Sequence, residues 1–134
     1  IREVPNAGNN PRIVMYHEST GAVGERANDA VAWCSSFVNY CVEQAGFIGT
    51  NSQAAQSWKD WGSDATDKPQ PGDIAVFSRG SVKWQGHVGF WVSEEAGNIS
   101  VLGGNQSDRV RIQRYPKDGK LGNVSYKLLA VRRP

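Results

Sequence analysis

The two parts of this chain carry different hydrophobic periodicities, and this division most constrains its fold. Between about residues 31 and 45 the apolar residues recur at helical spacing, and Gly46 follows as a stop signal. After residue 73 come short apolar runs separated by turn signals such as Gly97-Asn98 and Asp118-Gly119. Helices that come first and antiparallel strands that come later predict an α+β domain.

Each expected element has its own local signal. Asn10 is a suitable N-cap and Pro11 suits the first position of a helix, so a short helix is expected to begin there. Two more helices are expected over 31–45 and 52–61, the second ended by Gly62. The sheet is expected to have about five to six strands, among them 74–77, 87–93, 98–102, 109–114 and 128–132.

Length and composition limit the class of protein. The 134 residues, 39% of them hydrophobic, predict one domain over 1–134 with a core of its own. The formal net charge of +2 suits an anionic polymer and is too weak to indicate a nucleic-acid partner. No apolar run approaches the roughly 20 residues that span a membrane, so no membrane insertion is expected. The first residues show neither an initiator Met nor a signal-peptide core, so the sequence does not indicate native targeting.

Cys34 is the most reactive side chain that the expected helices and strands bring to a defined position. It falls at the start of the helix expected over 31–45, where free N–H groups and the helix dipole favour a thiolate and should lower the thiol pKa. It shares the inward face of that helix with Phe37 and Cys41. Cys41 is expected to be a small buried hydrophobic residue. Seven residues along a helix separate the two Cα atoms by about 10 Å, which is too far for a disulfide.

A histidine and an amide follow in an order that suits catalysis by a thiol. His87 leads an expected strand, and Gly89 on the same face should let the helix approach closely enough for His87 to reach Cys34. Asn105 follows the next strand, and its amide oxygen could hold one imidazole nitrogen and so select the tautomer. Gln106 and Asn98 are the alternatives for this third position. A Cys, a His and an amide are the parts of a site for thiol acyl transfer.

The remaining histidine and the tryptophans suggest no competing kind of site. With only two histidines, and no paired Cys motif, the chain predicts no metal site and no cofactor. His17 is expected on the surface of the first helix. Trp33 and Trp84 are predicted to flank the site as flat walls for sugar rings or short peptides, with simple packing as the alternative.

Three ordered motifs resemble those of a known family. The segments 33–38 (WCSSFV), 71–77 (PGDIAVF) and 86–92 (GHVGFWV) are similar to motifs of the NlpC/P60 and CHAP branch of papain-like cysteine peptidases and amidases. Segments 9–13, 49–50, 57–58 and 102–106 resemble a compact subfamily of phage lysins and bacterial wall-associated proteins. Many relatives have Asp or Pro before the cysteine motif, where this chain has Ala32. The resemblance implies N-terminal helices packed on a C-terminal antiparallel sheet.

The same resemblance implies a function. It predicts a monomeric catalytic domain that acts at the bacterial cell wall and cleaves an amide in the peptide moiety of peptidoglycan. The activity would be that of an endopeptidase or of an N-acetylmuramoyl-L-alanine amidase. Cys34 would be the nucleophile, His87 the general base and acid, and Asn105 the orienting residue, with an acyl-enzyme released by water. The alternatives are a non-catalytic wall-binding module, and a thiol acyltransferase or deamidase that acts on protein.

Overall fold

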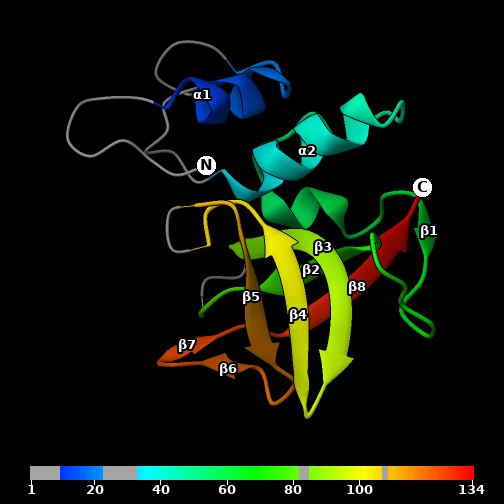
Figure 1. Ribbon diagram of the computed structural model, residues 1–134, viewed down its shortest axis with the longest axis vertical. Helices are drawn as coiled ribbons and strands as arrows, with labels where there is room; N and C mark the ends of the chain where they lie inside the picture. Colours follow the sequence, from blue (N-terminus) through cyan, green and yellow to red (C-terminus); the bar gives the residue numbers. More distant parts are fainter. Residues whose placement is uncertain (1–9, 23–32, 82–84, 107–108) are drawn as a thin grey trace.

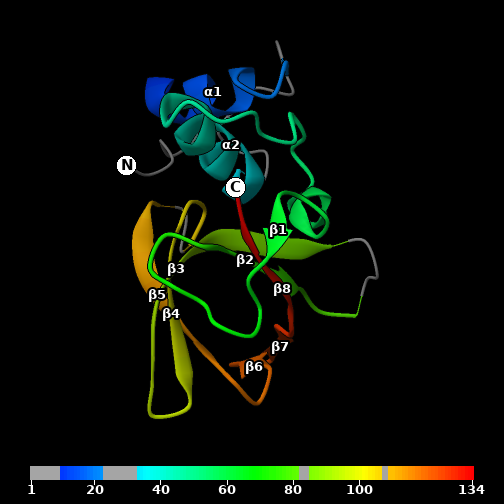
Figure 2. The same cartoon turned by 90° about the vertical axis from the view of Figure 1, so that its right-hand side faces the viewer.

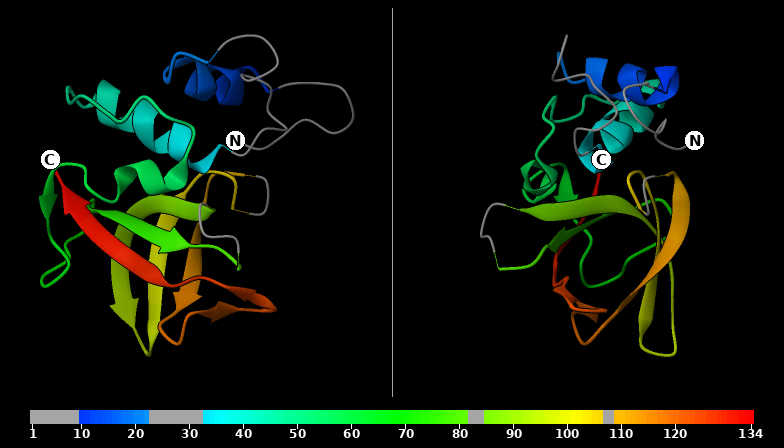
Figure 3. Two further views of the ribbon diagram at one scale, coloured as in Figure 1. Left: turned by 180° about the vertical axis from the view of Figure 1, so that it is seen from behind. Right: turned by 90° about the vertical axis from the view of Figure 1, so that its left-hand side faces the viewer.

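The computed structural model describes residues 10–22, 33–81, 85–106 and 109–134 and has the expected α+β architecture. The helices α1 (Pro11–Glu18) and α2 (Cys34–Gln44) lie together over one end of a curved antiparallel sheet (Figures 1 and 2). The 3-10 turn η2 (Ala55–Trp58) lies between α2 and the strands β2 and β3 (Figure 3). None of the described helices is long and apolar enough to cross a membrane.

The main sheet has the strand order β1-β8-β2-β3-β4-β5, and every neighbouring pair in it is antiparallel. In the register of β2 against β3, Phe77 lies opposite His87. A separate pair is formed by the short strands β6 and β7. The strands are β1 (Ser63–Asp64), β2 (Ile74–Ser78), β3 (Gly86–Glu95), β4 (Asn98–Gly103), β5 (Arg111–Pro116), β6 (Lys120–Leu121), β7 (Val124–Ser125) and β8 (Leu128–Arg133).

Local signals explain the first two helices and fail for the third. The Asn10 side chain accepts a hydrogen bond from the Arg12 N–H at 2.8 Å, as expected of an N-cap. Gly46 follows α2 with φ of +90°, a conformation that glycine adopts without strain. The helix expected over 52–61 is only the single turn η2. Ser52, where that helix was expected to begin, is instead bound to α2, because Ser35 Oγ donates to its carbonyl at 2.6 Å.

Buried residues form two clusters, one on each face of the sheet. The first lies between the helices and the sheet and includes Trp33, Phe37 and Val88. The second lies on the opposite face and includes Phe77 and Tyr115, whose rings stack with centroids 4.9 Å apart. Because side chains alternate along β3, Val88 points toward the helices while its neighbour His87 points toward the second cluster.

Two glycines allow close approaches near the end of the sheet. A Cβ on Gly89 would clash with the Val101 side chain, so this glycine makes room for β4. The prediction that Gly89 makes room for the helix is therefore wrong. A Cβ on Gly104 would lie 2.7 Å from atoms of both Phe37 and Trp33. The chain leaving β4 therefore passes directly against α2, which brings the next residues over the sheet beside His87.

An ion pair links strand β8 to the turn before β2, in the segment 71–73 (PGD). Arg133 donates from Nε to Asp73 Oδ1 at 2.9 Å and from Nη2 to Asp73 Oδ2 at 2.7 Å. Asp73 is 4% exposed, so this carboxylate is almost completely removed from water. The pair ties the chain end to the turn before β2. Asp73 therefore has a structural role in this fold.

Candidate active site

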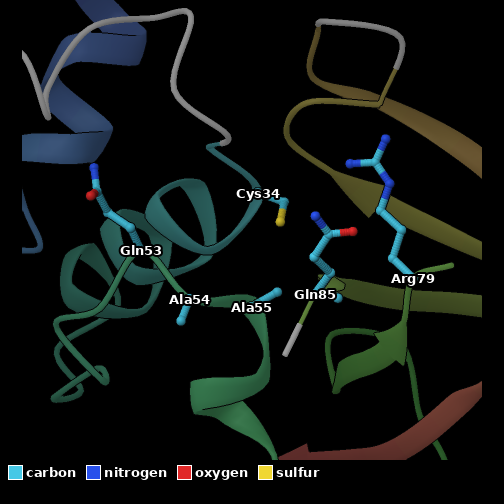
Figure 4. A pocket seen from close by; sticks show the side chains of 7 residues that line it. Cys34, Gln53, Ala54, Ala55, Arg79 and Gln85 are labelled. Carbon is cyan, nitrogen blue, oxygen red and sulfur yellow. The ribbon is translucent and has the colours of Figure 1, made fainter. Parts of the chain in front are cut away.

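Cys34 is the first residue of α2, and its N-cap is Trp33. A tryptophan side chain has no oxygen that could accept from the first N–H groups of the helix. Those N–H groups therefore remain at the helix end beside the thiol. Cys34 is 6% exposed and opens onto a pocket of about 200 Å³ (Figure 4). The pocket is lined by Cys34, Gln53, Ala54, Ala55, Arg79, Gln85 and Gly86.

The thiol is not held as a thiolate. Burial raises the pKa of Cys34 above its ordinary value. Backbone N–H groups, including that of Val88, and the positive charge of Arg79 act in the opposite direction but do not outweigh burial. The expectation of a lowered thiol pKa is therefore wrong, because desolvation of the charged form exceeds the helix-end effect. Both cysteines are free, which confirms that they do not pair.

His87 lies at the start of β3 and is also held in its neutral form. Burial disfavours the imidazolium and lowers the pKa of His87 to about 4, and the nearby Arg79 charge lowers it further, although a hydrogen bond with Gln106 acts to raise it. Val88, whose N–H lies at the thiol, directly follows His87 in β3. The structure thus brings the thiol and the imidazole to the same end of this strand.

The partner of His87 is Gln106, at 2.8 Å between Nε2 and Oε1. The Gln106 amide nitrogen donates to the Val101 carbonyl at 3.1 Å and to the Arg111 carbonyl at 2.6 Å, which fixes Oε1 as the atom that faces the ring. Tyr115 also donates to Oε1, at 3.0 Å. Since Oε1 can only accept, Nε2 must carry the proton. His87 Nδ1 is therefore left as a lone pair, free to act as a base.

The prediction of Asn105 as the orienting residue needs correction. Asn105 adopts φ of +58° in the turn after β4, and the next residue is the one that turns into the sheet and contacts the imidazole. Asn98 lies at the opposite end of β4, paired with Glu95. The alternative Gln106 is thus the amide at His87. Only the close packing of this turn against α2 selects Gln106 over Asn105, and no pattern in the sequence predicts that packing.

Buried hydrogen bonds hold the first turn of α2 in place. Trp58 Nε1 donates to Ser35 Oγ at 2.8 Å, and Ser36 Oγ lies 2.7 Å from His17 Nδ1. His17 is fully buried, so its expected place on the helix surface is wrong. A polar residue on a short helix is buried here because α2 supplies it with a hydroxyl partner. Sequence reasoning missed these supporting residues of the nucleophile.

Of the two tryptophans predicted to flank the site, only Trp33 lies in the described part of the chain. Trp33 is fully buried and lies against Tyr16, with ring centroids 6.1 Å apart. It is therefore a packing residue and not an exposed wall of the pocket, because α1 covers the face of the ring. Trp84 lies outside the described residues, as does Ala32. Within the described ranges no group of three or more His, Cys, Asp or Glu side chains is placed to hold a metal ion.

Comparison with known proteins identifies the family. The CHAP domain matches residues 26–105, which include Cys34 and His87 and end one residue before Gln106. No curated protein and no solved structure matches the chain. The matched region is more than half of the chain and contains the thiol on α2 and the imidazole on β3. The chain therefore belongs to the CHAP domain family, whose members are generally hydrolases that act on peptidoglycan.

Proposed function

We propose that this protein cleaves an amide bond in the peptide moiety of peptidoglycan through a covalent acyl-enzyme on Cys34. One observation carries the proposal: a buried amide fixes the His87 tautomer with an unprotonated Nδ1, at the strand end where the thiol lies. A nucleophile, a base and a group that orients the base are what thiol acyl transfer requires.

The acylation step begins from neutral partners. Because burial raises the pKa of Cys34 and lowers that of His87, both groups are uncharged in the resting site. As Cys34 Sγ attacks the scissile carbonyl carbon, His87 Nδ1 takes the thiol proton. The imidazolium then gives that proton to the leaving nitrogen as the C–N bond breaks. The products of this step are a free amine and a thioester on Cys34.

The end of α2 suits the charge that develops on the carbonyl oxygen. The N–H groups of Cys34 and Ser35 lie at the thiol and act to lower its pKa against the effect of burial, so they would be near the carbonyl that the sulfur attacks. Because Trp33 cannot cap them, they are available to donate to an oxyanion. Removal of a single oxyanion donor costs about 10²–10³ in kcat in other enzymes, so these donors are expected to matter as much as the base.

Water completes the cycle. His87 Nδ1 takes a proton from a water molecule that attacks the thioester carbon, and the imidazolium returns a proton to the Cys34 sulfur as it leaves. The overall reaction consumes one water and yields a carboxylic acid and an amine. Gln106 holds the ring throughout, because its oxygen accepts from Nε2–H in both charge states of His87.

The proposal is tested by mass spectrometry of purified sacculi after digestion. New soluble muropeptides are expected from the wild type and from Cys41→Ala, which removes the other thiol, but not from Cys34→Ala. The masses and new termini of the products assign the cleaved bond and separate an endopeptidase from an N-acetylmuramoyl-L-alanine amidase. Sacculi left intact by the folded wild type, or digested equally well by Cys34→Ala, would overturn the proposal in favour of a wall-binding module or a protein-modifying enzyme.

A further inference from the structure

The pocket beside Cys34 is lined by a guanidinium, that of Arg79, for which the described residues supply no counterion. Arg79 follows β2, is exposed, and lines this pocket together with the thiol (Figure 4). Among the residues that the structure describes, the ion pairs are Lys117 with Glu94 and Arg133 with Asp73, so Arg79 has no carboxylate partner there. A cation in a substrate pocket without an internal counterion is available to a ligand.

The other groups in the pocket fit a negatively charged ligand. Of the described residues that line it, none has an acidic side chain, and the polar ones besides Cys34 and Arg79 are the amides Gln53 and Gln85. Gln53 is turned toward α1, where its Nε2 lies 2.9 Å from His17 Nδ1. The Gln85 side chain lies between the thiol and Arg79 as viewed in Figure 4, and so adds a neutral donor on the same side of the pocket.

The position of Arg79 limits which part of a substrate it could meet. Arg79 and Cys34 line the same pocket, so the guanidinium borders the space that a substrate bound at the thiol would occupy. A planar guanidinium matches a carboxylate through two parallel N–H···O bonds. A carboxylate bound there would belong to the residue that adjoins the scissile amide.

We propose that Arg79 forms an anion subsite, which binds a free carboxylate on the substrate residue next to the cleaved amide. The inference rests on the proposed function and narrows its substrate class to acidic peptides. The subsite would distinguish a free carboxylate from the corresponding carboxamide, which has the same shape but no charge. A carboxamide would leave the guanidinium without a counterion inside the pocket.

The test uses two synthetic muropeptides for each amide bond of the peptide moiety, so the choice of peptides does not depend on the result of the sacculus digestion. The two differ only in a carboxylate or a carboxamide on the residue flanking that bond. The wild type is expected to prefer the carboxylate by about tenfold in kcat/KM, the size of one charge-assisted hydrogen bond partly open to solvent. Arg79→Gln should reduce this ratio to about one. The ratio is informative because any effect of Arg79 on the thiol itself changes both rates equally.

Lys127→Gln provides a matched control. It also removes one exposed positive charge, but Lys127 lines a different pocket, with Gln56, Lys59, Ser78, Gly80, Ser81 and Leu129. This variant should keep the tenfold ratio of the wild type. Equal rates for the two peptides in the wild type, or an unchanged ratio in Arg79→Gln, would overturn the subsite while hydrolysis itself stands.

A binding measurement separates failure of the subsite from failure of the proposed hydrolysis. Calorimetry on Cys34→Ala, which cannot form the thioester, should show about tenfold tighter binding of the carboxylate peptide than of the carboxamide peptide. The double variant Cys34→Ala/Arg79→Gln should lose this difference. Selective binding by Cys34→Ala without cleavage by the wild type would support the subsite and refute the hydrolysis. Equal binding of the two peptides would refute the subsite whatever the wild type cleaves.

Discussion

Replacing Gln106 with methionine should separate the orienting residue seen in the structure from the one that the sequence suggested. Methionine has nearly the same length and volume but no amide, so Gln106→Met removes the contact with His87 and leaves the cavity filled. The matched control is Asn105→Gly, because glycine tolerates the φ of +58° at that position without strain. We expect the first variant to lose activity and the second to keep it.

The magnitude follows from the hydrogen bonds that are lost. Gln106 accepts from His87 and Tyr115 and donates to the carbonyls of Val101 and Arg111. At about 1 kcal/mol net for each buried hydrogen bond, Gln106→Met should lower the free energy of unfolding by about 4 kcal/mol. The rate of hydrolysis per folded molecule should also fall, by about 10- to 100-fold. The reason is that the imidazole, without its partner, samples both tautomers and several orientations.

Two assays check these values. Urea unfolding followed by tryptophan fluorescence gives the free energy of unfolding and the folded fraction. Muropeptide release at a temperature where both variants are folded gives the rate for each folded molecule. The reasoning would be refuted if Gln106→Met kept its rate within about twofold of the wild type, or if Asn105→Gly lost more activity than Gln106→Met.

Two further predictions concern stability and pH. The pKa of His87 is about 4 in the folded protein and near 6.5 in the unfolded chain, so the unfolded state takes up the proton first as the pH falls. The neutral His87 side chain therefore makes its full contribution to the free energy of unfolding above about pH 6.5. About 3 kcal/mol of the free energy of unfolding is lost as the pH falls to 4. Urea unfolding of His87→Gln should show a shallower pH slope than that of the wild type, and equal slopes would contradict the assignment. Asp73→Asn should lower the free energy of unfolding by about 2 kcal/mol, because a single amide oxygen cannot accept both bonds from Arg133. An unchanged urea midpoint would show that the ion pair does not stabilise the fold.

The sequence by itself determined two of the three expected helices, the main strands of the sheet and the order of the reacting groups. The helical spacing around 31–45 predicted α2 with Cys34 at its start, and the alternating runs predicted the strands of an antiparallel sheet. Asn10 as a helix cap and the two free cysteines were also predicted correctly. These features depend on neighbours within a few residues, whose periodicity and capping chemistry are visible in the chain itself.

Only the tertiary structure decided the environment of each group. Whether Asn105 or Gln106 meets His87 depends on one residue of register in a turn that packs against α2. The burial of His17 and Trp33 depends on how α1 lies on α2. The protonation states of the thiol and the imidazole follow from the same packing, because burial outweighs the local charges. Desolvation depends on all surrounding atoms, most of them far away in sequence, and so no local pattern of residues reports it.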